Sequence, residues 1–326
     1  MNKMVTIIIT TWNSLDYLKL NLESLREYTE IPHEIVIVDN GSDDGTKEYI
    51  NSLNNKEIVY IRNHKNLGTI KALQIAEKFI KTRFMVLLDS DSIVSPNWLS
   101  IFLSFCESNP QVRAIGPIKP SSKLIYPYRN DKNSRQVWDE VKSNNLGKSP
   151  NELLALYCGN RSYAEFVNDF TDTNKEKDSV LTCPPEILSG CCTFLDYDFI
   201  KPLGGLTNDA FKDYGVDDAD RCWRIARAGG LVIRTGKVYV HHFEGSSLKK
   251  NNLNYRPLLY KNNRVLLDLW SKEFWDFVVK SKEPLFDLAG KYWLVRELLL
   301  SARLNQIPEK FRTESESLKD ILVSSV

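Results

Sequence analysis

Short apolar runs rich in β-branched residues alternate with stretches whose apolar positions recur every three or four residues along the first 120 residues. Continuous β-branched runs are typical of buried parallel strands, and the wider spacing is typical of amphipathic helices. The predicted strands are Val5–Thr10, Glu34–Val38, Ile58–Arg62, Phe84–Leu88 and Val112–Gly116. The predicted helices between them are 15–25, 46–53, 69–81 and 96–106. This alternation predicts an α/β fold with a doubly wound, mostly parallel sheet and flanking helices.

Polar clusters follow four of the five predicted strands, at the point where each strand ends. These clusters are Thr10–Asn13, Asp39–Asp44, Asn63–Gly68 and Asp89–Asp91. In open α/β sheets, ligands bind in the crevice outside the carboxyl ends of the strands. The four clusters therefore predict one binding site along a single edge of the sheet.

The pattern changes after the fifth predicted strand. Residues 120–180 are rich in Ser, Asn, Lys and Asp and have weak periodicity, which predicts an insertion of short helices. Regular patterns return at Glu186–Leu195, without a definite element type. A helix is predicted at Asp217–Ala228, and short strands are predicted at Leu231–Arg234 and Val238–Val240. From Tyr255 onward the pattern is helical, with large apolar side chains as anchors. These anchors are Trp270, Trp275, Phe277 and Trp293.

The charge balance is nearly neutral, with 43 Lys and Arg against 42 Asp and Glu and a net charge of +1. A partner that is mainly nucleic acid or an anionic membrane surface is therefore not expected. No apolar run approaches the roughly 18 residues of a membrane span, and the N-terminus lacks the pattern of a secretory signal. None of the six cysteines forms a C-x-x-C pair. These features predict a cytoplasmic protein with reduced thiols, and they leave open a peripheral position at the inner face of the membrane.

Asp89 and Asp91, separated by Ser90, are the strongest chemical signal. The two carboxylates directly follow a buried strand, and side chains two residues apart on an extended segment share a face. Two carboxylates so close repel each other unless a cation lies near them. Oxygen ligands suit Mg²⁺ or Mn²⁺, which can also hold phosphate oxygens. An acidic turn that caps the next segment is the structural alternative.

Three other groups are candidates for binding or catalysis. Asp39 can accept a hydrogen bond from a nucleobase or ribose, or it can form an Asx-turn. Three acids within 217–220 lie at the start of a predicted helix, where the helix dipole favours negative charge. An acid that is not needed to cap the helix can act as a general base. His241 and His242 follow a predicted strand, where a histidine either binds a metal or packs as a structural residue in the core.

In this order, the motifs resemble the family 2 inverting nucleotide-sugar glycosyltransferases, over residues 4–270. The matching segments are Thr10-Thr11-Trp12-Asn13, Val38-Asp39-Asn40-Gly41-Ser42-Asp43-Asp44-Gly45-Thr46, Asn66-Leu67-Gly68, Asp89-Ser90-Asp91, Pro96-Asn97-Trp98-Leu99, Gly204-Gly205, Asp217-Asp218-Ala219-Asp220 with Arg224, a histidine before Gly245-Ser246, and Asn262-Asn263-Arg264. The chain departs from the family pattern at Trp12, where Tyr is usual, and at Asp217, where Glu is usual. It also has Thr69-Ile70 where Phe-Ala is commoner. None of these changes removes a catalytic group.

The resemblance implies a GT-A fold and a metal-assisted single displacement that inverts the anomeric carbon. Asp91 and Asp89 are expected to hold Mn²⁺ or Mg²⁺, and Asp89 has the ribose as an alternative partner. His241 is the expected third metal contact, with His242 as the second choice. The expected general base is Asp218, with Asp217 as the fallback. The residues expected to bind the nucleotide sugar are Thr10, Thr11, Trp12, Asn13, Asp39, Asn66, Gly68, Lys71, Asp89, Ser90 and Arg264.

The same resemblance divides the chain into a catalytic domain, 1–255, and a helical extension, 256–326. The catalytic domain comprises a nucleotide-binding half (1–119), the insertion (120–185) and an acceptor and catalytic half (186–255). The favoured donor is a UDP-sugar, and the acceptor is a glycan, a lipid-linked sugar or a protein, as in polysaccharide or glycoconjugate biosynthesis. For the extension, packing on the catalytic domain or in a homodimer is favoured over membrane docking, because acidic residues dilute its basic ones.

Other function classes fit parts of the sequence. A haloacid-dehalogenase-like phosphatase would use Asp89 and Asp91 in its nucleophile loop, but that family usually carries the nucleophile on the first strand, and here the pair follows the fourth. A sugar nucleotidyltransferase needs a Gly-rich, Arg-containing N-terminal loop, which the sequence lacks. A non-catalytic nucleotide-sugar-binding module would have lost some of the expected acids, yet all of them are present.

Overall fold

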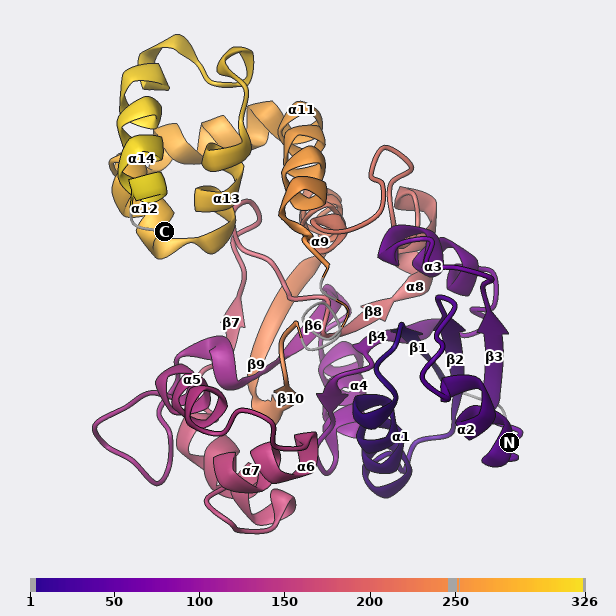
Figure 1. Cartoon of the computed structure of the whole chain (residues 1–326). Coiled ribbons are helices and arrows are strands. Elements are labelled where there is room, and N and C mark those ends of the chain that lie inside the picture. Colours follow the sequence, from indigo (N-terminus) through magenta and orange to yellow (C-terminus); the bar gives the residue numbers. More distant parts are fainter. Residues whose placement is uncertain (1–3, 246–250, 252, 325–326) are drawn as a thin grey trace.

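The computed structural model describes residues 4–245, 251 and 253–324 of the chain. Its centre is an eight-stranded sheet with the strand order β3-β2-β1-β4-β8-β6-β9-β7 (Figure 1). The strands are β1 (Val5–Thr11), β2 (His33–Asp39), β3 (Ile58–Arg62), β4 (Phe84–Asp89), β6 (Val112–Ile118), β7 (Ser179–Val180), β8 (Cys192–Asp196) and β9 (Leu231–Tyr239). A separate two-stranded ribbon pairs β5 (Ser92–Ile93) with β10 (His241–His242).

The N-terminal half of the sheet is parallel. Strand β1 pairs in parallel with β2 and β4, and β2 pairs in parallel with β3. Strand β8 runs antiparallel between β4 and β6, so the fifth predicted strand does not lie beside the fourth. The predicted doubly wound, mostly parallel sheet is confirmed, and β8 is an antiparallel element that the alternation pattern did not indicate.

Helices cover both faces of this sheet (Figure 1). One face packs on α1 (Leu15–Tyr28), α2 (Thr46–Ser52) and α4 (Trp98–Ser108). The other face packs on α3 (Thr69–Glu77), α8 (Tyr197–Ile200) and α9 (Asp217–Arg227). Trp98 and Phe102 on the first face and Trp223 on the second are almost completely buried. Both faces of the central strands are therefore withdrawn from water, which explains their continuous apolar runs.

The insertion forms a third core around the β5–β10 ribbon. Its helices are α5 (Ser134–Asn144), α6 (Pro150–Tyr157) and α7 (Tyr163–Asn174), as the prediction of short helices requires. The core is mainly aromatic, with Tyr126, Trp138, Tyr157, Phe166, Phe170, Tyr239 and Phe243 among its buried members. Each helix starts with a reciprocal capping box, in which the first and fourth residues bond each other's backbone. The pairs are Asn133 with Gln136, Ser149 with Glu152, and Ser162 with Glu165.

The C-terminal helical module (residues 256–324) comprises α11 (Arg256–Ser281), α12 (Leu285–Lys291), α13 (Trp293–Ser301) and α14 (Arg312–Ser324). It shares one hydrophobic core with α3 and α9. Trp270 and Trp275 are buried in it and Phe277 is partly buried, whereas Trp293 remains 50% exposed. None of the described helices combines the length and apolar character needed to cross a lipid bilayer.

Two predicted elements differ from those observed. The short strands expected at Leu231–Arg234 and Val238–Val240 are joined in one strand, β9, because parallel pairing with β6 runs to Thr235 and resumes at Tyr239 after an irregularity in the register. The segment Glu186–Leu195, for which the sequence predicted regular structure of no stated type, is a loop up to Cys192, where β8 begins. The chain also contains short 3₁₀ turns at Pro120–Ser122, Lys201–Leu203, Leu304–Gln306 and Glu309–Phe311.

Candidate active site

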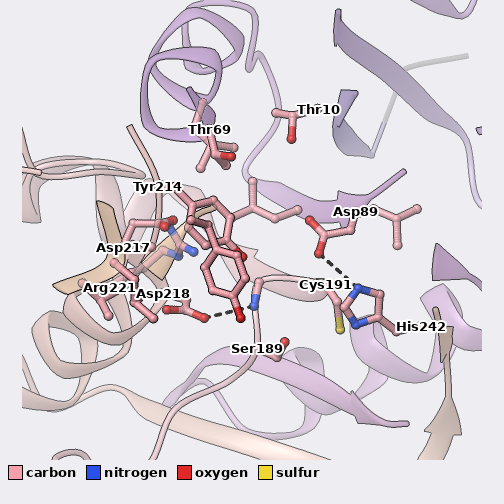
Figure 2. A pocket seen from close by; sticks show the side chains of 18 of the residues that line it. Thr10, Thr69, Asp89, Ser189, Cys191, Tyr214, Asp217, Asp218, Arg221 and His242 are labelled. Atoms are coloured by element: carbon pink, nitrogen blue, oxygen red, sulfur yellow. Dashed lines mark hydrogen bonds and ion pairs between the residues drawn. The ribbon is translucent and has the colours of Figure 1, made fainter. Parts of the chain in front are cut away.

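A pocket opens at the carboxyl ends of β1 and β4, at the edge where the polar clusters predict a site. It has a cavity volume of about 250 Å³. Figure 2 shows Asp89 and His242 on one side of the pocket and Asp217 and Asp218 on the other, with Tyr214 between them. The lining therefore combines segments from the parallel strands, the β5–β10 ribbon, the start of α9 and the C-terminal helical module.

Asp89, Asp91 and His242 form a cluster whose three ligand atoms lie within 4.8 Å of one another. The His242 Nε2 atom is 3.1 Å from Asp91 Oδ1 and 3.5 Å from Asp89 Oδ2. The short β5–β10 ribbon creates this arrangement, because His242 pairs with Ser92, the residue directly after Asp91. Two carboxylates and an imidazole fit a divalent cation such as Mn²⁺ or Mg²⁺.

His241 lies on the opposite side of the same ribbon. Its ring is completely buried against Trp138, Tyr157 and Phe243, and its Nδ1 atom is 2.9 Å from the Tyr239 hydroxyl. Burial lowers the pKa of His241 to about 3, so the ring stays neutral. The sequence analysis ranked His241 first for metal contact, but the structure does not bring it to the aspartates. The reason is that adjacent side chains of a strand point to opposite faces, so His241 points away when His242 faces the aspartates.

Burial and mutual repulsion shape the charges of the cluster. Burial raises the pKa of Asp89 to about 6; His242 opposes this shift and Asp91 adds to it. For His242, burial acts to lower the pKa, but the Asp91 carboxylate and the Cys191 side chain together outweigh burial and raise the pKa well above its usual value. The protonated imidazole therefore supplies positive charge beside the two carboxylates. A bound cation would take over that role and displace the proton.

The acids at the start of α9 have different partners. Asp218 accepts hydrogen bonds from the Ala219 amide at 2.8 Å and the Gly190 amide at 3.3 Å. Burial, with a further contribution from Asp217, raises the pKa of Asp218 to about 6. Asp217 lies 3.4 Å from the Arg221 guanidinium. Of this pair, Asp218 is therefore the carboxylate better prepared to accept a proton near neutral pH.

The third acid of this motif has a structural role. Asp220 is buried, 2.7 Å from Arg224 Nε, and it accepts a hydrogen bond from Trp270 Nε1 at 3.0 Å. The Arg224 contact lies within α9, and the Trp270 contact joins α9 to α11. Asp220 is therefore held by its partners and does not line the pocket.

The predicted residues on β1 lie beside the aspartate cluster. Thr10 lines the pocket. Thr11 Oγ1 is 3.0 Å from Ser14 Oγ, which in turn is 3.1 Å from Ser90 Oγ. This buried chain of hydroxyl groups ties the turn after β1 to the residue between the two aspartates.

Asp39 lies farther inside, at the end of β2 opposite Thr11. Its carboxylate is completely buried and accepts hydrogen bonds from the Ser42 amide at 2.8 Å and the Tyr60 hydroxyl at 2.5 Å. Arg62 Nε is 3.5 Å from the same carboxylate. Both oxygens of Asp39 are thus engaged within the protein, as in the Asx-turn that the sequence also allowed.

The turn after β1 holds the next two predicted residues. Asn13 has a left-handed backbone with φ of 47°, and its side chain accepts a hydrogen bond from the Asp43 amide at 2.8 Å and donates one to Asn251 at 2.9 Å. The Trp12 carbonyl accepts a hydrogen bond from the same Asn251 side chain at 3.4 Å. Trp12 and Asn13 are therefore next to β2 but do not line the pocket.

The remaining predicted residues lie outside the pocket lining. Asn66 and Lys71 are exposed, and Lys71 Nζ is 3.3 Å from Gln74. Gly68, with φ of 82°, stands so close to Asp213 that a Cβ would lie 2.7 Å from its Cα atom, so only glycine fits there. Arg264 points into the C-terminal helical module, where its Nε donates to the Ser301 carbonyl at 2.7 Å. The predicted role of Arg264 in nucleotide binding has no counterpart in this geometry.

Several lining residues were not assigned to the site from the sequence. They are Ser189, Gly190 and Cys191 before β8, Tyr214 before α9, Tyr255 before α11, and Leu259 and Trp293 from the C-terminal helical module. Tyr214 could have been found, because it directly precedes the turn that opens the acidic helix. The residues of the C-terminal helical module carry no local motif, so only the tertiary fold reveals them.

Comparisons with known proteins show the family and the fold of the chain. The family model "Glycosyl transferase family 2" matches residues 6–169. Hyaluronan synthase of Pasteurella multocida is 29% identical over 248 residues, which are 74% of this chain and 24% of that protein. The matches to the first three curated relatives cover between 24% and 42% of those relatives' lengths.

Two solved structures share the fold. A mannosyltransferase from Pyrobaculum calidifontis in complex with GDP-Man and Mn²⁺ has a TM-score of 0.54 and 15% identity, covering 100% of this chain and 76% of that chain. A GalNAc-T structure with UDP, GalNAc and Mn²⁺ has a TM-score of 0.57 and 16% identity, covering 97% of this chain and 54% of that one. The expected GT-A fold is therefore confirmed.

Proposed function

Because the chain belongs to glycosyl transferase family 2, we propose that it transfers a sugar from a nucleotide diphosphate sugar to an acceptor hydroxyl, with inversion at the anomeric carbon. The observation that carries this proposal is that two groups meet at one pocket: the Asp89–Asp91–His242 cluster, of which Asp89 and His242 line the pocket, and the Asp218 carboxylate. A single displacement needs both, since the leaving diphosphate and the attacking hydroxyl lie on opposite sides of the anomeric carbon.

Asp89, Asp91 and His242 are the residues that we assign to a divalent cation, Mn²⁺ or Mg²⁺. When bound there, the cation neutralises the charge that develops on the leaving diphosphate. The mixed oxygen and nitrogen donor set supports this assignment. The Mn²⁺ in two structures that share the fold supports it as well. We assign the third contact to His242 in place of His241, which points away.

Asp218 is the residue that we assign as the general base. It would take the proton of the acceptor hydroxyl as that oxygen attacks, and its raised pKa of about 6 suits that transfer near neutral pH. Asp217 stays the alternative. Its ion pair with Arg221, four residues later in α9, gives it a second use, which is to stabilise the first turn of that helix.

The acceptor side of the pocket is aromatic. Tyr214, Tyr255 and Trp293 all line it, and the Tyr214 and Tyr255 rings meet edge to face at 5.5 Å. An aromatic wall beside carboxylates suits a sugar ring, whose C–H face packs on the rings while its hydroxyls bond the acids. We therefore propose a saccharide acceptor, free or lipid-linked. A protein side chain stays the alternative.

The test is a screen of nucleotide sugars with Mn²⁺ or Mg²⁺, each incubated with a mixture of saccharide acceptors. We expect release of a nucleoside diphosphate from one donor, with UDP-sugars the favoured class, and formation of a glycoside of inverted configuration. Release of phosphate from a phosphomonoester such as p-nitrophenyl phosphate, with every nucleotide sugar left intact, would favour the phosphatase alternative and contradict the proposal.

Replacing Asp39 tests donor binding. Asp39→Ala removes a buried carboxylate that holds the Ser42 amide and the Tyr60 hydroxyl at the end of β2, where we expect the nucleobase to bind, so the affinity for UDP should fall even without metal, as calorimetry can measure. Tyr60→Phe is the control, because it removes the hydrogen bond at 2.5 Å but keeps the carboxylate. Equal UDP affinity in Asp39→Ala and wild type would exclude Asp39 from nucleotide recognition.

Trp293 offers a direct test of the acceptor side. Trp293→Ala should raise KM for the saccharide acceptor by about tenfold, the effect of one lost aromatic contact, while donor hydrolysis by water stays unchanged. Phe286→Ala is the matched control, because Phe286 is 51% exposed on the same module but does not line the pocket. An equal KM in the two variants would remove Trp293 from the acceptor site.

A further inference from the structure

The loop that leads into the acidic helix α9 has a backbone that ordinary residues rarely adopt. Asp213, Gly215 and Val216 all have positive φ, at 58°, 99° and 57°. Val216 is β-branched, and such residues almost never occur in this region without strong external constraint. The loop carries Tyr214 into the pocket and ends at Asp217 and Asp218, so whatever constrains it also places these side chains.

The N-terminal half of the sheet holds one side of this loop. The Ile70 amide donates a hydrogen bond to the Asp213 carbonyl at 3.2 Å. Gly68 packs directly on Asp213, with no room for a Cβ. These contacts hold the loop at Asp213, whereas the carbonyls of Lys212, Tyr214 and Gly215 accept hydrogen bonds from the C-terminal helical module.

A single side chain of the C-terminal helical module holds the other side. The Asn262 Oδ1 atom accepts a hydrogen bond from the Lys212 amide at 3.1 Å. Its Nδ2 atom donates to the carbonyls of Lys212 at 2.6 Å, Tyr214 at 2.8 Å and Gly215 at 3.4 Å. Asn262 is 1% exposed, so water does not compete for these bonds.

We propose that Asn262 is a positioning residue for the acceptor side of the active site. Through the loop backbone, its carboxamide sets where Tyr214 and the general base Asp218 stand relative to the metal cluster. Other contacts from α11 agree with this role: Leu259 packs on Gly215, where a Cβ would lie 2.7 Å from its side chain. The C-terminal helical module is then part of the catalytic apparatus and not an appended domain. The role in turnover rests on the proposed function, whereas the control of loop geometry does not.

The next residue on α11 gives a matched control. Asn263 is also an asparagine, is 0% exposed, and donates its Nδ2 hydrogen bond at 3.2 Å to the Glu297 carbonyl of α13, away from the loop. Asn262→Ala and Asn263→Ala therefore each remove a buried carboxamide from the same helix. They differ in whether the lost bonds reach the active-site loop.

The first measurement needs no substrate. Hydrogen exchange of the Lys212 amide should become faster in Asn262→Ala and stay as in wild type in Asn263→Ala. Asn262→Asp keeps the oxygen that accepts from Lys212 but loses all three donated bonds, so the Lys212 amide should remain protected. Unchanged exchange in Asn262→Ala would overturn the proposal. So would failure of both Asn262 variants to fold while Asn263→Ala folds, because Asn262 would then be a determinant of the fold.

The second measurement separates positioning from binding. With the donor found by the nucleotide-sugar screen, Asn262→Ala and Asn262→Asp should both lower kcat by about 10- to 100-fold, the cost of a small misplacement of reacting groups, with the donor KM unchanged. Asn263→Ala should keep kcat within about twofold of wild type. Equal kcat losses in Asn262→Ala and Asn263→Ala would overturn the positioning role. Absence of activity in wild type would contradict the proposed function but leave the exchange result standing.

Discussion

Asp218→Asn is expected to lower kcat by about 10²- to 10⁴-fold, because it keeps the size of the side chain and removes the proton acceptor. Affinity for the nucleoside diphosphate should stay unchanged, since the metal cluster lies on the other side of the pocket. Asp217→Asn is the matched control one residue away. A dead Asp217→Asn beside an active Asp218→Asn would reverse our assignment within the pair.

The pH dependence follows from the raised pKa of Asp218. A base with a pKa of about 6 is ionised and active above that pH, and it loses activity as the pH falls through 6. In wild type at saturating metal, kcat should therefore decline on the acidic side with a midpoint near 6. The small residual activity of Asp218→Asn should lack this decline. Persistence of the same acidic limb in the variant would assign it to another group.

The thermal stability of the protein gives an independent check of the raised pKa of Asp218. Because the folded pKa of Asp218 lies above its usual value, the folded protein binds its proton more tightly than the unfolded chain does. This contribution favours folding at low pH and is lost as the pH rises through about 6. At pH 7 the buried carboxylate is a cost to the fold, so Asp218→Asn should melt at or above the wild-type Tm. A lower Tm would show that the carboxylate stabilises α9.

The sheet and the edge that carries the site could be predicted because their signals are local. The apolar run Val5–Thr10 and the polar residues after it report burial and exposure directly along the chain. The position of β8 could not be predicted, since the alternation pattern says nothing about which strand a later segment joins. The hydrophobic periodicity of the insertion is weak, but two of its helix starts are marked in the sequence by capping-box pairs. These pairs are Ser149 with Glu152 and Ser162 with Glu165.

Some residues of the site could not be predicted from the sequence, and the physical cause is clear. The choice between His241 and His242 depends on which face of a two-residue strand meets Asp91, and that is decided by pairing with β5. The contributions of Asn262 and Trp293 depend on docking of helices far along the chain. The sequence marks Asn262 only as part of the segment Asn262-Asn263-Arg264 and Trp293 only as an apolar anchor, and neither pattern indicates a contact with the site.

The metal cluster leads to the other large expected effect. Asp91→Ala should lower metal-supported kcat by about 10³-fold or more, because the leaving diphosphate loses a counter-charge worth several kcal/mol. Binding of Mn²⁺, measured by electron paramagnetic resonance in the absence of any donor, should weaken in parallel. Asp91 is almost buried and pairs with His242 at 3.1 Å, so circular dichroism is needed to show that the variant folds.

The histidine pair supplies the discriminating comparison for this prediction. His242→Ala should weaken Mn²⁺ binding by about 10- to 100-fold, the usual cost of losing a group that holds a metal site together. His241→Phe should leave Mn²⁺ affinity unchanged, because His241 sits between Trp138 and Phe243 and an aromatic ring can replace it there. The reverse result would return the third contact to His241. Full activity of wild type in excess chelator would refute the metal assignment, since the carboxylates alone cannot neutralise a diphosphate.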